Sequence, residues 1–287
     1  MKIAHLILAH SEPVQLERLI GRLLHEDACF FIHVDQKTDI SPFQFLTSYP
    51  NVFLVKNREK VAWGAYSIVQ ATLNGFKEIA DSGKNIDVVN LLSGSDYPLK
   101  NTEQIHSFFV QNPGQNFIKY ELVFEQWHEA ITRLTKYHLT NYEFPGKYFV
   151  QKWLNKILPA RKLPGQLVPV GRSQWLSITI DALRYILKYL EEHPQIVRFF
   201  KLTWAPDEII FQTILYNSGF RESIVNNNLR YIDWSAGKPS PKTLTTEDLP
   251  ELLKSDALFA RKFDMKNHIE ILNQLDARAG KPSINQH

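Results

Sequence analysis

Two adjacent carboxylates stand at the start of an apolar run in the second half of the chain. Asp207 and Glu208 follow Trp204-Ala-Pro206, and the apolar pattern after them predicts a helix over residues 207–217. Pro206 suits the first helical position, because its φ is already helical and it has no N–H to leave unpaired. The helix dipole favours acidic side chains in a first turn, so the pair has a purely structural explanation. A functional role for it depends on residues elsewhere in the chain.

Basic side chains near the C-terminus form a second candidate group. Arg261 and Lys262 are flanked by Phe259 and Phe263, and Lys242 lies in the preceding Pro-rich loop. These cations either belong to a solvated helix face or converge on one ligand. Converging cations could neutralise a departing pyrophosphate, the role that Mg²⁺ or Mn²⁺ plays in many nucleotide-sugar enzymes. The sequence has no Asp-x-Asp, His-x₃-His or His-Glu-x-x-His spacing, which disfavours metal catalysis.

Polar and aromatic residues follow several predicted strands. Asp35 comes directly after residues 29–34 and either caps a turn or hydrogen-bonds a ribose or uracil edge. Trp63 is either a core residue or a platform for a base or sugar ring, and Gly64 beside it would permit close approach of the backbone to a ligand. Asp96 would point beyond the sheet and accept hydrogen bonds from sugar hydroxyls, although its polar turn needs no ligand to form.

The elements that position these residues alternate between strands and helices in the first hundred residues. Short apolar runs predict strands at 3–9, 29–34, 52–55 and 87–92, and helical spacing predicts helices at about 13–24 and 66–80. Asn101 or Thr102 is expected to cap a further helix. The alternation predicts an α/β protein with a largely parallel, doubly wound sheet, whose ligands bind beyond the carboxyl ends of the strands.

The rest of the chain is predicted to complete a single domain over residues 1–279. Residues 117–169 are aromatic, basic and irregular. We expect an insertion that forms one wall of a cleft, on the side where a second, acceptor substrate would bind. Its basic and aromatic side chains allow weak association with a membrane surface, but a solvated basic loop is the favoured interpretation. Further helices are expected at 181–192, 247–255 and 264–275, and residues 280–287 are expected to form a flexible tail.

Composition narrows the class of protein. The chain has 287 residues, of which 44% are hydrophobic and 22% charged, as in ordinary globular proteins. A net charge of only +3 gives no whole-molecule case for nucleic acid binding. The single cysteine, Cys29, excludes an intrachain disulfide and a Cys-based zinc site. The apolar run at residues 3–9 is too short to span a bilayer and has no cleavage site after it, so a cytoplasmic location is expected.

Six motifs in order resemble those of a known family. Together they are similar to the core-2/I-branching β-1,6-N-acetylglucosaminyltransferases and the peptide O-xylosyltransferases, glycosyltransferase family 14, over roughly residues 3–275. The motifs are Ile32-His-Val-Asp-Gln-Lys37, Val61-Ala-Trp-Gly64, Asn90-Leu-Leu-Ser-Gly-Ser-Asp-Tyr-Pro-Leu-Lys100, Gly171-Arg-Ser-Gln-Trp175, Pro206-Asp-Glu208 and Leu258-Phe-Ala-Arg-Lys-Phe-Asp264.

The resemblance implies a GT-A-type fold and a role for each motif. Glu208 matches the catalytic base, and Asp207 is a capping or orienting neighbour. Lys262 matches a cation on the pyrophosphate, with Lys242 preferred over Arg261 as the second cation. The implied donor-binding residues also include Leu8, Asp35, Trp63 and Asp96, and the candidate acceptor-binding residues are Glu121, Arg133, Trp175, Trp204 and Asp207.

The leading functional hypothesis is an inverting, metal-independent glycosyltransferase that forms a β-linkage and needs no cofactor. It would transfer GlcNAc or xylose from a UDP-sugar to a glycan or lipid-linked saccharide. The alternative is a non-catalytic protein that binds nucleotide-sugars or glycans with the same fold, and a nucleotidyltransferase is disfavoured because paired metal-binding carboxylates are absent. The animal relatives have an anchor, a stem and disulfides that this chain lacks, so we expect a bacterial, cytoplasmic protein, at most peripherally associated with the inner face of the membrane.

Overall fold

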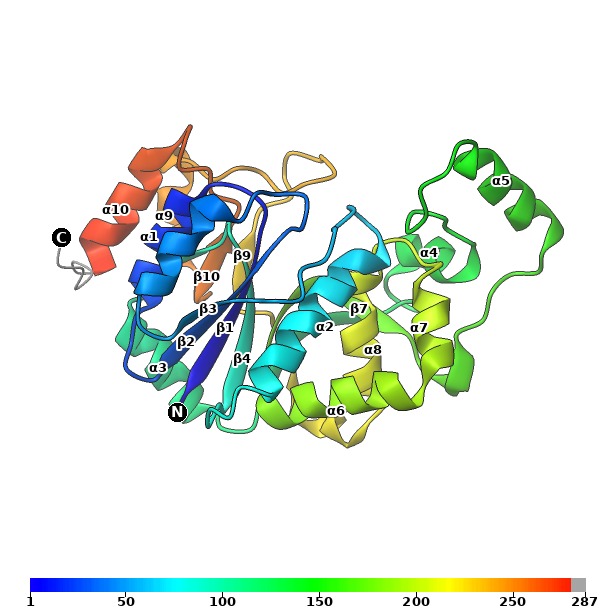
Figure 1. Cartoon of the computed structure of the whole chain (residues 1–287), viewed down its shortest axis with the longest axis horizontal. Helices are drawn as coiled ribbons and strands as arrows, with labels where there is room; N and C mark the ends of the chain where they lie inside the picture. Colours follow the sequence, from blue (N-terminus) through cyan, green and yellow to red (C-terminus); the bar gives the residue numbers. More distant parts are fainter. Residues whose placement is uncertain (280–287) are drawn as a thin grey trace.

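The computed structural model describes residues 1–279, so the predicted tail at 280–287 lies outside the described residues. The chain forms an α/β fold around a seven-stranded, mostly parallel sheet with the order β3-β2-β1-β4-β7-β6-β8 (Figure 1). This result confirms the predicted α/β class with a Rossmann-like central sheet flanked by helices. Within residues 1–279, no helix combines the length and the apolar character needed to cross a bilayer.

The N-terminal half of the sheet is parallel and follows the predicted strands closely. Strand β1 (Ile3–Ala9) lies between β2 (Ala28–Val34) and β4 (Val88–Ser93), and β3 (Val52–Leu54) pairs with β2. All of β2 and nearly all of β1 are buried, because helices cover both faces of the sheet. Such strands appear in a sequence as continuous apolar runs, which explains why they could be predicted.

The other half of the sheet contains the strand that reverses direction. Strand β7 (Val170–Thr179) runs antiparallel to both β4 and β6 (Asn116–Leu122), and β6 pairs in parallel with β8 (Ile224–Val225). The predicted insertion at 117–169 is therefore wrong at its start, since residues 117–122 belong to the central sheet. The outer half of β6 is only partly buried and carries charged residues, so its pattern resembles that of a loop.

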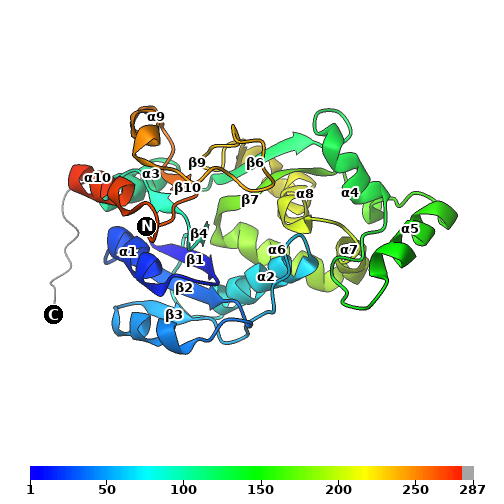
Figure 2. The same ribbon diagram turned by 90° about the horizontal axis from the view of Figure 1, so that it is seen from above.

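Helices cover the two faces of the sheet and bury alternate residues of β1. Ala4 and Leu6 pack into one core, whereas Ile3 and Ile7 pack into the other. The first core contains α2 (Tyr66–Ala80), α6 (Ile180–Glu192), α7 (Pro194–Phe200) and α8 (Ile210–Tyr216). The second contains α1 (Pro13–Leu23), α3 (Thr102–Gln111), α9 (Leu249–Lys254) and α10 (Ile269–Ala279), and Figure 2 shows the two groups from above.

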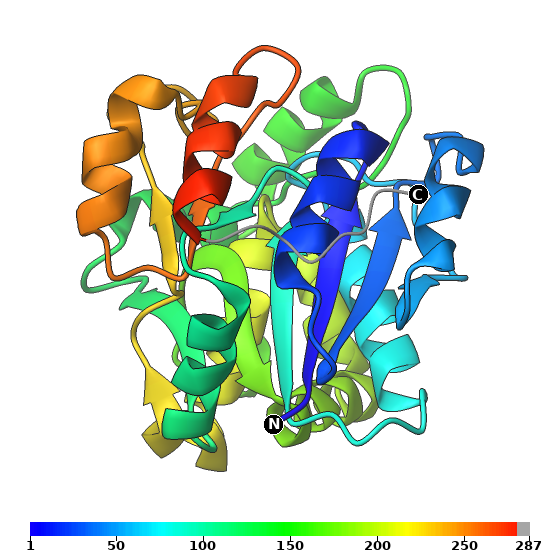
Figure 3. The same cartoon turned by 90° about the vertical axis from the view of Figure 1, so that its left-hand side faces the viewer.

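A smaller sheet completes the second core. It consists of β5 (Tyr97–Pro98), β10 (Phe259–Arg261) and β9 (Arg230–Ile232), and Figure 3 shows it beside α9 and α10. The interpretation of residues 258–263 as a solvated helix face is wrong, because Phe259 and Phe263 are buried in this core. The predicted helix at 264–275 begins later, at Ile269, because the Asp264 carboxylate accepts hydrogen bonds from Asn267 and holds a turn instead.

Short elements connect these layers. In the middle of the chain they are α4 (Ile131–Thr135) and α5 (Lys147–Ile157), with 3₁₀ turns at His128–Ala130 and Pro164–Gln166. The remaining 3₁₀ segments are Ser41–Ser48, Pro206–Glu208, Gly219–Ser223 and Thr246–Asp248.

The cap of α3 offers a test of local stability. The Asn101 side chain accepts a hydrogen bond from the Gln104 N–H (2.8 Å), and the Gln104 side chain accepts one from the Asn101 N–H (3.0 Å). We expect Asn101→Ala to lower the free energy of unfolding by about 1 kcal/mol, measured by chemical denaturation, because the substitution leaves helix N–H groups without this partner. The control Gln111→Ala, at an exposed site on the same helix, should be nearly neutral; equal losses would contradict the assignment.

Candidate active site

The carboxyl ends of three parallel strands meet at one edge of the sheet. In register, Ala9 of β1 lies opposite Val34 of β2, and Leu8 lies opposite Ser93 of β4. The Asp35 N–H donates to the Ala9 carbonyl (2.8 Å), so Asp35 begins the turn at this edge. The residues that follow these strands therefore lie together, as the alternating pattern predicted.

Asp35 caps its own turn and keeps a second carboxylate oxygen near a cation. Its Oδ1 accepts a hydrogen bond from the Lys37 N–H (2.9 Å), and its Oδ2 lies 3.5 Å from the Lys37 ammonium. The Arg58 guanidinium donates to the Val34 and Asp35 carbonyls (2.9 and 2.8 Å) and fixes the backbone at this point. The capping interpretation is therefore confirmed, and the carboxylate is held in a defined orientation at the strand end.

Asp96 is fully buried rather than directed beyond the sheet. Its Oδ2 accepts from the Ser93 N–H (3.1 Å), and its Oδ1 lies 3.3 Å from the Arg261 Nε. The Arg261 guanidinium stacks over the Trp175 ring at 4.1 Å from its centroid. Burial raises the pKa of Asp96, and the charges of Arg261 and Arg230 oppose that shift. Asp96 therefore orients Arg261 and Trp175 instead of presenting a free carboxylate.

Arg230 supports this group from inside the sheet. It is buried and donates hydrogen bonds to the Leu91 carbonyl (2.7 Å), the Ser177 hydroxyl (3.0 Å) and the Asn90 side-chain oxygen. Sequence reasoning missed this residue. A single arginine within a short apolar run gives no local signal of burial in a hydrogen-bonded network.

The backbone holds Lys262 close to the turn that follows β4. The Phe263 N–H donates to the Ser95 carbonyl (2.9 Å), and the Leu244 N–H donates to the Lys262 carbonyl (2.8 Å). Among residues 1–279, Lys262 takes part in no salt bridge, whereas Lys242 pairs with Asp248 at 2.6 Å. The structure thus brings the two predicted lysines onto adjoining segments, with Lys242 already engaged by a carboxylate.

Asp207 and Glu208 do not begin an α-helix, which corrects the prediction. They lie in the 3₁₀ segment Pro206–Glu208, and α8 begins after Ile209, whose ψ of −43 and φ of −129 interrupt the helix. Strand β7 supports this turn: a Cβ on Gly171 would overlap the Glu208 carbonyl oxygen and lie 2.9 Å from the Ile209 Cα. Only a glycine in β7 therefore allows the Glu208 backbone to sit where it does.

The Glu208 side chain ends in a group of aromatic rings and one cation. Its Oε2 lies 2.5 Å from the Arg133 Nη1, and the Arg133 guanidinium stacks over both Trp127 (4.7 Å) and Trp204 (4.5 Å). The exposed Trp63 meets Trp204 edge to face at 5.4 Å. We call Trp63, Trp127, Arg133, Trp204 and Glu208 the Glu208 cluster.

Gly64 permits close approach of a protein side chain. A Cβ at this position would lie 2.7 Å from the Trp204 Nε1, and Gly64 has a φ of +70°. The Ala205 N–H also donates to the Gly64 carbonyl (2.8 Å). The sequence predicted that a ligand would approach the backbone closely at Gly64; in the structure the group that the glycine admits is the Trp204 indole.

Glu121 joins the Glu208 cluster through an arginine of β7. The Arg172 Nε lies 3.4 Å from Glu121, its Nη1 lies 3.0 Å from Glu129, and its guanidinium lies over the Trp127 ring. The Trp127 indole N–H donates to Glu129 (2.7 Å), which lowers the pKa of that carboxyl, and Arg172 lowers it further. Trp127, Glu129 and Arg172 were not predicted. Arg172 lies inside a motif that the sequence singled out, but the other two gave no signal.

The buried Asp207 is the least satisfied carboxylate at the site. Its Oδ1 has no hydrogen-bond partner within residues 1–279. Burial raises the pKa of Asp207, the negative charge of Glu208 raises it further, and Arg133 opposes both effects. The folded protein therefore favours the protonated form of Asp207, next to a Glu208 that is paired with a cation.

Strand β7 connects the two halves of the site. Gly171 supports Glu208, Arg172 binds Glu121, and Trp175 carries Arg261 and through it Asp96. Within residues 1–279, no group of three or more His, Cys, Asp or Glu side chains could hold a metal ion. The arrangement places the Glu208 carboxylate, the exposed Trp63 ring and two lysines on segments that meet at the carboxyl edge.

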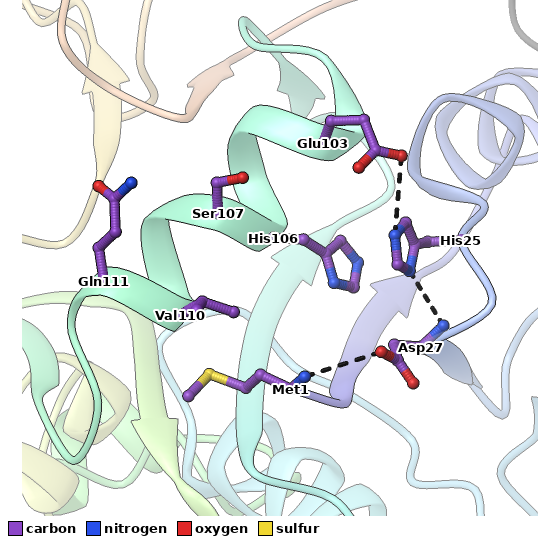
Figure 4. Close-up of a pocket in the computed structure, with 8 residues that line it drawn as sticks. All are labelled: Met1, His25, Asp27, Glu103, His106, Ser107, Val110 and Gln111. Carbon is purple, nitrogen blue, oxygen red and sulfur yellow. Dashed lines mark hydrogen bonds and ion pairs between the residues drawn. The ribbon is translucent and has the colours of Figure 1, made fainter.

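A hollow of about 280 Å³ lies elsewhere, near the amino ends of β1 and β2 (Figure 4). There His25 stacks on His106 at 3.7 Å, and the Asp27 carboxylate lies 3.7 Å from the Met1 amine. Ligands of open α/β sheets bind at the carboxyl ends of the strands, so this hollow is not part of the candidate active site.

The fold and site define an α/β protein whose candidate ligand-binding edge combines carboxylates, tryptophans and cations. The chain belongs to the Core-2/I-Branching enzyme family, whose model matches residues 3–255.

Curated relatives extend this similarity along the chain. It is 27% identical to xylosyltransferase 2 of Rattus norvegicus over 305 residues, and 27% identical to xylosyltransferase oxt of Drosophila melanogaster over 304 residues. Each alignment covers 96% of this chain and 33% of the relative, so the chain spans about a third of their length. Mouse xyloside xylosyltransferase 1 in its apo form matches with a TM-score of 0.42 and 10% identity, over 90% of this chain and 97% of that one.

The raised pKa of Asp207 predicts a pH-dependent stability. Because the folded state binds this proton more tightly than the unfolded chain, the stabilisation is complete below the ordinary Asp pKa of about 3.9 and is lost as the pH rises through the raised value. We therefore expect Asp207→Asn to be more stable than the parent protein at about pH 8, by roughly 1.4 kcal/mol for each unit of the shift, and nearly equal to it at about pH 4.

Chemical denaturation at the two pH values measures this difference. The exposed Asp256 provides a matched control, since Asp256→Asn changes charge equally without burial. A gain for Asp207→Asn that is independent of pH would contradict the proposed cause.

Proposed function

We propose that the chain is an inverting glycosyltransferase that moves a sugar from a UDP-sugar to a hydroxyl acceptor and forms a β-linkage. The observation that carries the proposal is the Glu208 carboxylate, held at the carboxyl edge by Arg133 between two tryptophans in a chain of this family. The donor sugar is xylose or GlcNAc, and the relatives named xylosyltransferase favour xylose. The acceptor is a glycan or a lipid-linked saccharide.

Glu208 is suited to act as the general base. The Arg133 guanidinium pairs only with Oε2. Oε1 has no hydrogen-bond partner within the described part of the chain, and the Glu208 side chain is 28% exposed. In the proposed reaction, Oε1 accepts the acceptor hydroxyl proton while that oxygen attacks the anomeric carbon. The bond from this carbon to the UDP oxygen breaks on the opposite face, so the configuration inverts and UDP leaves with the bonding electrons.

The remaining residues divide between the two substrates. Trp63, which is 68% exposed, and Trp204 offer ring faces to a sugar or base. On the donor side, Asp35 would accept hydrogen bonds from the uridine, and the backbone of Leu8, which accepts from the Gly94 N–H at 3.0 Å, shapes the edge below it. On the acceptor side, Glu121 and Arg133 extend from the same cluster as the base.

Lys262 is the proposed partner of the departing diphosphate. Backbone hydrogen bonds at the Lys262 carbonyl and at the Phe263 N–H fix the main chain of Lys262 at the edge before substrate binds. Lys242 would break its ion pair with Asp248 and bind a phosphate oxygen instead. Arg261 is already paired with the buried Asp96. Two lysine charges can stabilise the leaving group without a divalent ion.

The base assignment is tested with Glu208→Gln. We expect this variant to lose transfer by roughly 10²–10⁴-fold, because an amide cannot accept the proton, and to bind UDP as the parent does. Transfer is measured with UDP-xylose and UDP-GlcNAc, and UDP binding by calorimetry. The exposed Glu191 supplies the control, since Glu191→Gln should keep full activity.

The outcomes separate the candidate functions. A Glu208→Gln variant with parental turnover would show that another group is the base. A parent protein that binds UDP but neither transfers nor hydrolyses any UDP-sugar would instead be a non-catalytic binding protein.

The role of the lysines predicts resistance to chelation. We expect transfer to continue in excess EDTA, and Lys262→Ala to reduce the transfer rate by at least about tenfold, because the diphosphate then loses a fixed positive charge. Initial rates with and without EDTA provide the measurement. Activity that is lost in EDTA and restored by Mn²⁺ would contradict this prediction.

A further inference from the structure

Helix α5 is built with its apolar side facing outward. None of its eleven residues is buried, and Tyr148, Phe149 and Ile157 are 69%, 66% and 70% exposed. Trp153 is also exposed and meets Phe149 at 6.1 Å. A shallow hollow over this face is lined only by residues of the helix and by Leu158. Isolated exposed apolar residues are common, but a continuous patch of this kind marks an interaction surface.

The polar side of α5 is fixed to the body of the protein. The Asn155 side chain accepts from the Tyr137 N–H (2.7 Å) and donates to the Tyr137 carbonyl (2.8 Å). One turn earlier, the Gln151 side chain accepts from the Leu139 N–H (2.8 Å). These bonds hold the helix by its amides, so the apolar side cannot turn inward without breaking them. The outward orientation is therefore a property of the fold.

The segment after the helix is anchored as well. The buried Arg161 donates to the Lys136 carbonyl (2.9 Å) and to carbonyls at the end of α7, and its backbone N–H donates to the Thr135 carbonyl (2.9 Å). Figures 1 and 2 show α5 at one end of the molecule, beyond α4 and α7. The apolar face is thus carried on a fixed projection.

Positive charge surrounds this face, and the helix itself carries no acidic residue. Residues 144–180 contain no Asp or Glu, and the lysines at 147, 152, 156 and 162 form no salt bridge within residues 1–279. Lys156 lies over the Trp153 ring (5.3 Å) and Lys147 over the Tyr148 ring (5.2 Å). Cations therefore stand next to the aromatic rings, as on helices that lie in the headgroup region of a bilayer.

We propose that α5 docks the protein on a membrane surface that contains anionic lipids. Its aromatic and aliphatic side chains would enter the interface, and its lysines would contact lipid phosphates. Eleven residues make a helix of roughly 16 Å, which is too short to cross a hydrocarbon core of about 30 Å. A symmetric contact with a second copy is disfavoured, because it would bring like-charged lysines together.

The docked orientation has a consequence that rests on the proposed function. Arg161 ties the α5 segment to Thr135 at the end of α4, and α4 contains Arg133 of the Glu208 cluster. Docking would therefore place the acceptor side of the site near the bilayer, where a lipid-linked saccharide is held. Membrane binding itself requires no catalysis and can be tested separately.

Vesicle flotation tests the proposal with the full chain. The parent protein should float with vesicles of equal parts phosphatidylglycerol and phosphatidylcholine, and should remain unbound with phosphatidylcholine alone. Lys152→Gln with Lys156→Gln should weaken binding by about fivefold for each lysine removed. Phe149→Ser with Trp153→Ser keeps the charge and should weaken binding by at least about tenfold.

A matched pair on other helices controls for total charge. Lys188→Gln with Lys254→Gln removes the same charge from α6 and α9 and should leave vesicle binding unchanged. Thermal unfolding checks that each variant is folded. An equal loss in the control pair, or no binding by the folded parent protein, would overturn the proposal. A concentration-dependent dimer that the Phe149 and Trp153 variant abolishes would instead identify a second copy as the partner.

Discussion

The close contact between β7 and the Glu208 turn is the constraint on which the site depends. Gly171 has no side chain, so the strand approaches the Glu208 backbone at a distance that any Cβ would prevent. Next to this contact, Arg172 pairs with Glu121 and Glu129, and Trp175 contacts Arg261. Because β7 is also hydrogen-bonded between β4 and β6, Glu208, Trp175 and Arg261 share one rigid support.

Charge is distributed unequally over this support. Asp96 and Arg230 are buried, Arg261 is largely buried, and their charges compensate one another, which favours a fixed geometry over direct contact with a ligand. Glu208 and Lys262 are more accessible. Glu208 pairs through one carboxylate oxygen only, and Lys262 takes part in no salt bridge within residues 1–279. Asp207 has no comparable compensation, so the folded protein favours its protonated form. Buried charged groups without a full set of partners are typical of functional sites, where a protein is less stable because it holds its charges in a fixed arrangement.

How well each helix or strand could be predicted from the sequence depended on how completely it is buried. Residues 3–9 and 66–80 were predicted with the observed bounds, because a strand covered on both faces and a helix with one apolar stripe have distinct patterns. Residues 117–122 were predicted to belong to an irregular insertion, and residues 258–263 were left open between a solvated helix face and a group of converging cations. The outer half of the first strand is only partly buried and mixes charged with apolar residues. The second strand forms because it pairs with β9 and β5, which are distant in sequence.

The sequence by itself determined that polar residues follow the buried strands, that a helix is capped at Asn101 or Thr102, and that Asp35, Glu208 and Lys262 are candidate site residues, since these depend on local pattern and motif. The tertiary structure decided their partners: Arg133 for Glu208, Arg261 for Asp96 and Asp248 for Lys242. It also decided that the apolar side of α5 faces outward, because the side-chain amides of Gln151 and Asn155 bond to the backbone of Tyr137 and Leu139 in the preceding loop. Pairings of this kind arise from packing between segments, and no local spacing in the sequence encodes them.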